Sequence, residues 1–170
     1  MSRLVVVRHA KSDWPAGVPD RSRPLGPRGR ADAPKMGRRL GELVDAVDLA
    51  LVSPAARTQQ TWELLSAGLS RVGEVRSEER IYAAWGEDLV DLVRELPDTA
   101  TTVLIVGHEP GVSELVLALA DEDDPDLRRR VAAKYPTCGI AVLEHELSWS
   151  DWAWRSGALT SFLTPKDASD

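Results

Sequence analysis

The sequence predicts a single three-layer α/β/α domain with a mostly parallel central sheet, helices on both faces of the sheet and a late antiparallel pair of strands. Short apolar runs and segments of helical periodicity alternate along most of the chain, which is typical of parallel sheets covered by helices. The chain has 170 residues, 43% of them hydrophobic, and this is enough to bury a core of ordinary size. We therefore expect one domain over residues 1–165 and a disordered tail over residues 166–170.

The first half of the chain predicts two strands and two helices. Ser53 and Pro54 have the residue types of an N-cap and of a first helical position, so the second helix is expected to begin there. In chain order we expect a strand at Leu4–Val7, a loop at Lys11–Gly29, a helix whose apolar face is Met36, Leu40, Leu43, Val44 and Val47, a strand at Leu49–Val52, and a helix that continues through Trp62, Leu65 and Leu69.

The second half repeats the alternation and then changes character. A charged stretch, Asp121 to Arg130, precedes two late strands that we expect to pair as a hairpin. The tryptophans of the second late strand alternate and are expected to cover the sheet or the core. In chain order we expect a strand at Val72–Arg76, a helix with Leu89, Leu92, Val93 and Leu96, a strand at Thr101–Val106, a helix from Pro110 with Val112, Leu115, Val116 and Leu119, and strands at Gly139–Leu143 and Trp152–Leu163.

Composition and charge exclude several classes of protein. The net charge is −6, whereas nucleic-acid binders are usually basic. No apolar run approaches the length of a membrane helix, and Met1–Val7 is too short for the core of a signal peptide. The single cysteine, Cys138, allows no disulfide within the chain. We therefore expect a cytoplasmic protein that binds neither nucleic acid nor membrane.

Basic and imidazole side chains follow three of the predicted strands, at the sheet edge where α/β proteins gather ligand groups. The first strand ends in Arg8 and His9, the second leads through Ser53 to Arg57, and the third leads to His108. Together they would form an anion site. Each also has a simpler interpretation, because an arginine can extend into solvent and a histidine at a strand end can be structural. His145, the third histidine, is expected to be structural or exposed.

These residues lie in motifs that resemble the histidine phosphatase superfamily, and most of all its SixA-type phosphohistidine phosphatases. The motifs occur in the family's order over about residues 3–120. They are Val7-Arg8-His9-Ala10-Lys11-Ser12, Asp20 with Arg23-Pro24-Leu25 and Arg28-Gly29, Ser53-Pro54-Ala55-Ala56-Arg57-Thr58, and Val106-Gly107-His108-Glu109-Pro110-Gly111.

The resemblance implies a phosphatase that uses a phosphohistidine intermediate. His9 would be the nucleophile, and Arg8, Arg57 and His108 would hold the phosphate oxygens. No metal or cofactor is implied, because the arginines supply the positive charge. The substrate would be a phosphorylated protein, with phosphohistidine the favoured group, or a small phosphorylated molecule, and inorganic phosphate would be the product.

The identity of a general acid and the edge of the pocket are less defined by the motifs. Glu79 lies where many family members have a glutamate, and Glu109 is the alternative. Either carboxylate has a simpler interpretation, as a surface group for Glu79 and as a helix-start residue for Glu109. The remaining candidates for the pocket mouth are Lys11, Ser12 and Arg21, which are as consistent with a solvated loop.

Three other functions compete with a phosphohistidine phosphatase. The first is a small-molecule phosphomonoesterase or phosphoglycerate mutase-like enzyme of the same superfamily, although such members are often longer and have a capped site. The second is a phosphate-binding module without catalysis. The third is a metal hydrolase, which the absence of any HxH or HExxH spacing makes the weakest alternative.

Overall fold

A six-stranded sheet forms the centre of the structure, a computed structural model that describes residues 1–167. The strands are β1 (Ser2–Arg8), β2 (Ala46–Val52), β3 (Arg71–Ser77), β4 (Thr102–Gly107), β5 (Ile140–His145) and β6 (Ala158–Leu163). The α-helices are α1 (Pro27–Leu43), α2 (Ala56–Ser66), α3 (Gly86–Arg94), α4 (Gly111–Leu119) and α5 (Pro125–Ala133), and the 3₁₀ turns are Asp20–Ser22, Glu79–Ile81 and Trp149–Asp151.

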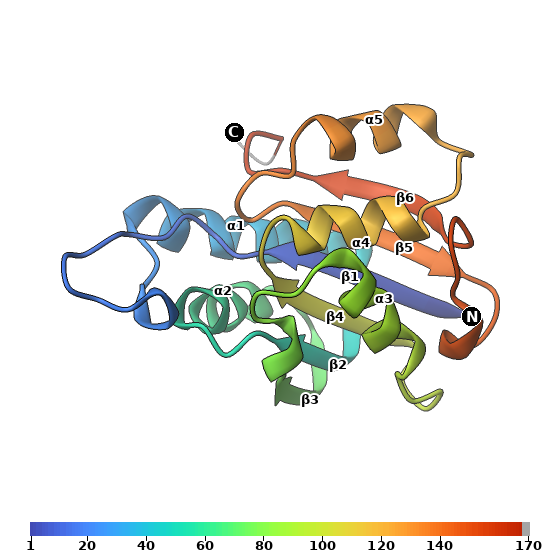
Figure 1. Cartoon of the computed structure of the whole chain (residues 1–170), viewed down its shortest axis with the longest axis horizontal. Coiled ribbons are helices and arrows are strands. Elements are labelled where there is room, and N and C mark those ends of the chain that lie inside the picture. The colour runs from blue at the N-terminus through green and yellow to red at the C-terminus, as the bar shows by residue number, and fades with distance from the viewer. Residues whose placement is uncertain (168–170) are drawn as a thin grey trace.

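The strand order across the sheet is β3-β2-β4-β1-β5-β6. The first four of these strands pair in parallel, whereas β5 is antiparallel to both β1 and β6. Helices cover both faces, and Figure 1 shows α3 and α4 crossing one of them. The predicted three-layer α/β fold, with a mostly parallel sheet and a late antiparallel strand pair, is confirmed.

Two separate apolar cores lie on the two sides of the sheet. One core contains the inner faces of α3 and α4 together with Trp149 and Trp152. The other contains the inner faces of α1 and α2. Alternate residues of β1 enter opposite cores, Leu4 and Val6 the first and Val5 and Val7 the second, so the apolar runs of the central strands are buried on both sides.

The two central strands end level with each other. In the parallel pair of β1 and β4, Val7 lies opposite Val106 and Arg8 lies opposite Gly107. The next residues, His9 and His108, therefore leave the sheet side by side. The long connection between β1 and α1 extends beyond this same end of the sheet (Figure 1).

Helix α1 begins earlier than its apolar pattern predicts. It starts at Pro27, and its buried face is Gly29, Ala33, Met36, Gly37 and Leu40. Two residues assigned to this face lie elsewhere, because Leu43 is 47% exposed and Val47 belongs to β2. A Cβ atom at Gly29 would lie 2.2 Å from the carbonyl oxygen of Lys11, so glycine lets the helix touch the loop that follows β1.

The C-terminal third differs from the prediction in two places. The charged stretch contains α5, which begins after the side chain of Asp124 accepts a hydrogen bond from the Leu127 N–H. The predicted start of the last strand at Trp152 is wrong, because β6 covers only Ala158–Leu163.

The tryptophans before β6 lie in a turn rather than on a strand. The rings of Trp149 and Trp152 stack at 5.7 Å, and their indole N–H groups donate to the Ala100 carbonyl and the Ser2 hydroxyl. These two rings are buried, whereas Trp154 is 68% exposed. Core packing and satisfied N–H groups therefore explain two of the three tryptophans.

Two further expectations concern the tail and the membrane. Of the predicted tail, residues 168–170 lie outside the described residues, and Asp167 accepts hydrogen bonds from Arg130 and Thr164. The disorder of the tail stays a prediction. Within residues 1–167, no helix is long and apolar enough to cross a membrane.

Candidate active site

The carboxyl ends of three neighbouring parallel strands bring the predicted site residues together. His9 follows β1 and His108 follows β4, and their imidazole rings lie 5.4 Å apart between centroids. Arg57 lies in the first turn of α2, which follows β2. His9 and Arg57 are buried, with 8% and 6% of their surface exposed, so the site is set into the sheet edge.

Hydrogen bonding defines the protonation state of His9. Its Nδ1 lies 2.8 Å from the carbonyl oxygen of Ala10, which can only accept, so Nδ1 carries the proton. Burial lowers the pKa of His9 to about 3, and the positive charges of Arg57 and Arg8 act in the same direction. The imidazole is therefore neutral near pH 7, and its Nε2 retains a lone pair.

The loop that holds His9 is tied to the helix that holds Arg57. The Ala10 N–H donates to Thr61 Oγ1 at 2.9 Å, and the Thr61 hydroxyl donates to the Arg57 carbonyl at 2.6 Å. Both Ala10 and Thr61 are fully buried. This buried chain of hydrogen bonds fixes the nucleophile candidate relative to the phosphate-binding candidate.

Ser53 contacts His108 and is not the N-cap that its sequence context predicts. The Ser53 N–H donates to Val106 at 3.1 Å, which extends the sheet by one residue, and α2 begins only at Ala56. The Ser53 hydroxyl does not cap the helix and lies 2.7 Å from His108 Nε2, within hydrogen-bond distance. Burial lowers the pKa of His108 to about 4, with a smaller contribution from the charge of Arg57.

Arg57 does not extend into solvent. Its guanidinium donates to the backbone carbonyl of Asp20 at 2.8 Å and to the Asp20 carboxylate at 3.1 Å. The same carboxylate accepts hydrogen bonds from Tyr82 and Arg23. These donors, Tyr82 first and then Arg57, lower the pKa of Asp20 to about 2, so it is a carboxylate at neutral pH.

Sequence reasoning missed Asp20 and Tyr82 as members of the site. The motifs include Asp20 without a role, although it is one of only two carboxylates, with Asp13, among the cations of the loop at residues 11–29, which is a usable signal for an ionic partner. The Tyr82 ring lies edge-on to His108, with 5.6 Å between centroids. No sequence pattern marks this tyrosine, because the contact depends on how the segment after β3 folds back over the strand ends.

Arg8 completes the cationic side of the site. Its guanidinium donates to the Tyr135 carbonyl at 2.8 Å, and burial lowers its pKa. Among the described residues, the buried side-chain nitrogens that lack a hydrogen-bond partner are Arg8 Nε, Arg57 Nε and His108 Nδ1. All three belong to residues that the sequence assigns to one phosphate site, and unsatisfied buried groups of this kind are typical of functional sites.

The two acid candidates are engaged in other contacts. The Glu79 side chain is 66% exposed and forms an ion pair with Arg21 at 2.6 Å. The Glu109 carboxylate accepts hydrogen bonds from the backbone N–H and the hydroxyl of Ser113, both at 2.8 Å, at the start of α4. Neither carboxylate forms a hydrogen bond with His9 or His108 in the described structure.

The three candidates for the pocket mouth occupy different positions. Arg21 is exposed and lies over the Tyr82 ring at 4.4 Å, so it borders the site through that tyrosine. Lys11 is exposed and lines a small cavity together with Arg8. Ser12 is buried and accepts a hydrogen bond from Arg23 at 3.0 Å, so its hydroxyl supports the loop instead of facing outward.

No group of three or more His, Cys, Asp or Glu side chains in residues 1–167 is arranged to hold a metal ion. Cys138, beside the site, is buried, and burial raises the pKa of its thiol to about 12. Its backbone N–H is shared between the carbonyls of Arg8 and His9, both at 3.0 Å. The backbone at position 138 therefore helps to hold the chain that follows β1 at the site.

Comparison with known proteins places this geometry in a family. Residues 4–87 match the model of the histidine phosphatase superfamily (branch 1). An uncharacterized protein of Mycobacterium tuberculosis is 38% identical over 162 residues, which cover 94% of this chain and all of that protein. An uncharacterized chloroplastic protein of Arabidopsis thaliana is 30% identical over 84% of this chain and 66% of its own length.

Solved structures of other proteins match the fold of this protein over nearly its whole chain. A candidate phosphohistidine phosphatase SixA from Nakamurella multipartitia has a TM-score of 0.84 and 30% identity, and the match covers 96% of each chain. The corresponding protein from Agrobacterium tumefaciens has a TM-score of 0.81 and 27% identity over 96% of this chain and 98% of its own. Together with the strand-end histidines and arginines, these matches show that the chain belongs to the histidine phosphatase superfamily and is a SixA-like phosphatase.

Proposed function

We propose that this protein hydrolyses phosphohistidine in proteins, with His9 as the nucleophile and inorganic phosphate as the product. The observation that carries the proposal is the state of His9: it is buried and neutral, and it donates through Nδ1 so that Nε2 keeps its lone pair. A neutral imidazole fixed in this way is a nucleophile toward phosphorus at neutral pH. We expect the enzyme to act in the cytoplasm.

The first step transfers the phosphoryl group to His9. Nε2 attacks phosphorus, and the P–N bond to the substrate imidazole breaks. The electron pair of that bond leaves with the imidazole, which takes up a proton from solvent. Arg8, Arg57 and His108 hold the phosphoryl oxygens in this proposal, and the positive charge of the arginines stabilises the charge in the transition state.

The second step regenerates the enzyme. A water molecule attacks the phosphorus of phosphorylated His9, and the P–N bond to Nε2 breaks. The water oxygen becomes part of inorganic phosphate, and its proton is released to solvent. The hydrogen bond from Nδ1 to Ala10 keeps the ring in one orientation through both steps.

Two observations favour phosphohistidine over an alkyl phosphate ester. An alkoxide leaves poorly unless it is protonated, whereas an imidazole needs less help, and both carboxylates considered as acids are held in other contacts. In addition, the connection from β3 to α3 spans only residues 78–85, so this connection carries no long insertion over the strand ends. The names of the SixA structures to which this chain is similar agree with this choice.

The test is a substrate panel combined with trapping of the intermediate. The purified protein is assayed on a phosphohistidine peptide, p-nitrophenyl phosphate and 3-phosphoglycerate, with His9→Ala as the variant. We expect the phosphohistidine peptide to give the highest kcat/KM, and brief incubation to label the wild type with an acid-labile, base-stable phosphoryl group. Turnover that survives in folded His9→Ala would eliminate His9 as the nucleophile, and preference for 3-phosphoglycerate would favour a small-molecule enzyme.

A further inference from the structure

A basic groove leads away from the phosphate site on the side of α1, α5 and β6. Its inner part is a cavity of about 200 Å³ that is lined by Arg8, Lys11, Arg28, Lys134, Pro136 and Thr137. Its outer part is a cavity of about 570 Å³, which shares the last four of these residues. Because Arg8 lines the inner cavity, the groove starts at the candidate phosphate site itself.

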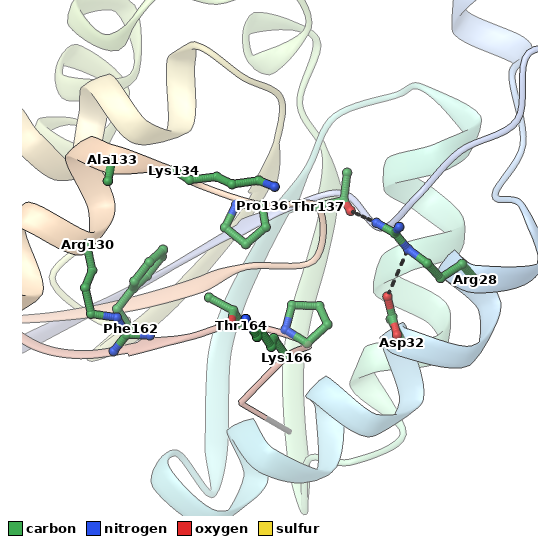
Figure 2. A pocket seen from close by; sticks show the side chains of 11 residues that line it. Arg28, Asp32, Arg130, Ala133, Lys134, Pro136, Thr137, Phe162, Thr164 and Lys166 are labelled. Atoms are coloured by element: carbon green, nitrogen blue, oxygen red, sulfur yellow. Dashed lines mark hydrogen bonds and ion pairs between the residues drawn. The ribbon is translucent and has the colours of Figure 1, made fainter. Parts of the chain in front are cut away.

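Hydrogen bonds and an ion pair hold the two arginines of the inner groove in place. The Arg8 guanidinium donates to Tyr135, in the segment that carries Lys134. Arg28 donates to the Thr137 hydroxyl at 3.3 Å and lies 3.8 Å from Asp32 (Figure 2). In the same view, the side chain of Lys134 extends toward Thr137 and Arg28.

The charge of the groove is opposite to that of the protein. Six cationic side chains and one carboxylate, Asp32, line the two cavities, whereas the whole chain carries a net charge of −6. Within residues 1–167, the ammonium groups of Lys11 and Lys134 form no ion pair. A cleft lined by one sign of charge concentrates ligands of the other sign, so this groove favours an anionic ligand.

The outer cavity also offers apolar surface. Phe162, Pro136, Ala133 and Pro165 form part of its wall, and Phe162 lies beneath the guanidinium of Arg130 at 5.4 Å. Its volume of about 570 Å³ lies within the range of roughly 300–1,000 Å³ that is typical of ligand clefts. The groove therefore combines a basic entrance next to the phosphate site with an apolar end.

We propose that this groove binds an acidic segment of the substrate protein that flanks the phosphohistidine and ends in an apolar residue. The inference rests on the proposed function, and it assigns substrate selection to Arg28 and Lys134. An extended segment advances about 3.3 Å per residue, so carboxylates a few positions from the phosphohistidine reach these cations while the phosphoryl group is at His9. Arg28 and Lys134 are specificity residues in this proposal, because they contact the segment and not the reacting atoms.

The test compares two phosphohistidine peptides that differ only in their flanks, one with glutamates and one with glutamines at the same positions. The variant is Arg28→Gln with Lys134→Gln. The matched control is Lys35→Gln with Arg38→Gln, which removes the same charge from exposed positions on α1 outside the groove. Hydrolysis of p-nitrophenyl phosphate reports on the phosphate site and on folding.

We expect the wild type and the control to prefer the glutamate peptide by about tenfold in kcat/KM at low salt, with the preference decreasing as salt screens the charges. The groove variant loses that preference while its rate on p-nitrophenyl phosphate stays within about twofold of wild type. Equal kcat/KM for both peptides in the wild type, or a preference that persists in the groove variant, would overturn the proposal.

Failure of the proposed function gives a different result. If p-nitrophenyl phosphate is hydrolysed but neither peptide is, phosphohistidine is not the substrate. The groove is then tested by competition, with the unphosphorylated glutamate peptide as inhibitor of p-nitrophenyl phosphate hydrolysis. Inhibition of the wild type and the control but not of the groove variant supports the groove, and equal inhibition or none in all three proteins rejects it.

Discussion

Acidification from pH 7 to pH 5 is expected to destabilise this protein through its two site histidines. In the folded protein, burial lowers the pKa of His9 to about 3 and that of His108 to about 4. In the unfolded chain, both imidazoles titrate near pH 6.5. The unfolded state therefore binds more protons than the folded state throughout the window between these values, and stability falls as the pH falls.

The size of the effect follows from the two pKa values. For His9, the unfolded state binds more protons than the folded state between pH 7 and pH 5. Summed over this pH range, the difference lowers the free energy of unfolding by about 2 kcal/mol. The corresponding loss for His108 is about 2 kcal/mol as well. Above about pH 8, neither group binds an appreciable number of protons in either state, so neither contributes to a pH dependence there.

Urea unfolding at pH 7 and pH 5 measures this effect directly. His9→Asn removes one of the titrating groups, so the variant is expected to lose about 2 kcal/mol less than the wild type over this pH range. The control is Lys35→Gln, an exposed change on α1 that leaves both histidines in place and is expected to retain the wild-type loss. Equal losses in the wild type and in His9→Asn would refute the conclusion that burial holds His9 neutral.

Three further predictions concern the chemistry. Because Glu79 is paired with Arg21 and Glu109 with Ser113, Glu79→Gln and Glu109→Gln are each expected to change kcat/KM by less than about threefold on an alkyl phosphate and on a phosphohistidine peptide; a loss of about 10²-fold confined to the alkyl phosphate would instead identify the substituted residue as the general acid. Arg57→Ala is expected to lower kcat/KM by about 10²-fold on phosphohistidine, aryl and alkyl substrates alike, and a loss confined to one of them would show that Arg57 does not hold the shared phosphoryl group. EDTA is expected to leave activity unchanged, and phosphate and vanadate to compete with substrate in steady-state assays; activity lost with EDTA and restored by one metal ion would support the metal hydrolase.

The central strands and the ends of those strands were predictable from the sequence. Leu4–Val7 and the run in β4 are apolar on both faces and end in polar residues, so periodicity and charge locate them. Parallel pairing then places His9 and His108 at one edge without further information. The family motifs agree with this placement, and their order along the chain reflects the order in which β1, β2 and β4 reach that edge.

The remaining site contacts depend on tertiary structure that no local pattern encodes. Ser53 has the residue type of an N-cap, but its N–H pairs with β4 and its hydroxyl lies beside His108. Asp20 reaches Arg57 only because the loop after β1 folds back over α2. Helix α5 was missed because Val131 is the only residue on it that is buried, which leaves almost no apolar periodicity to detect.

The central position of β1 has a consequence for how the chain folds during synthesis. The ribosome makes β1 long before its neighbours in the sheet, because β4 and β5 begin only at Thr102 and Ile140. Until β4 has been made, a strand whose residues Leu4 to Val7 are fully buried in the final structure has neither edge paired, and until β5 has been made one edge stays unpaired. Nascent chains that stop before Ile140 are therefore expected to depend on chaperones or to aggregate, because the strand that carries the nucleophile candidate is completed from both sides only after β5 has been made.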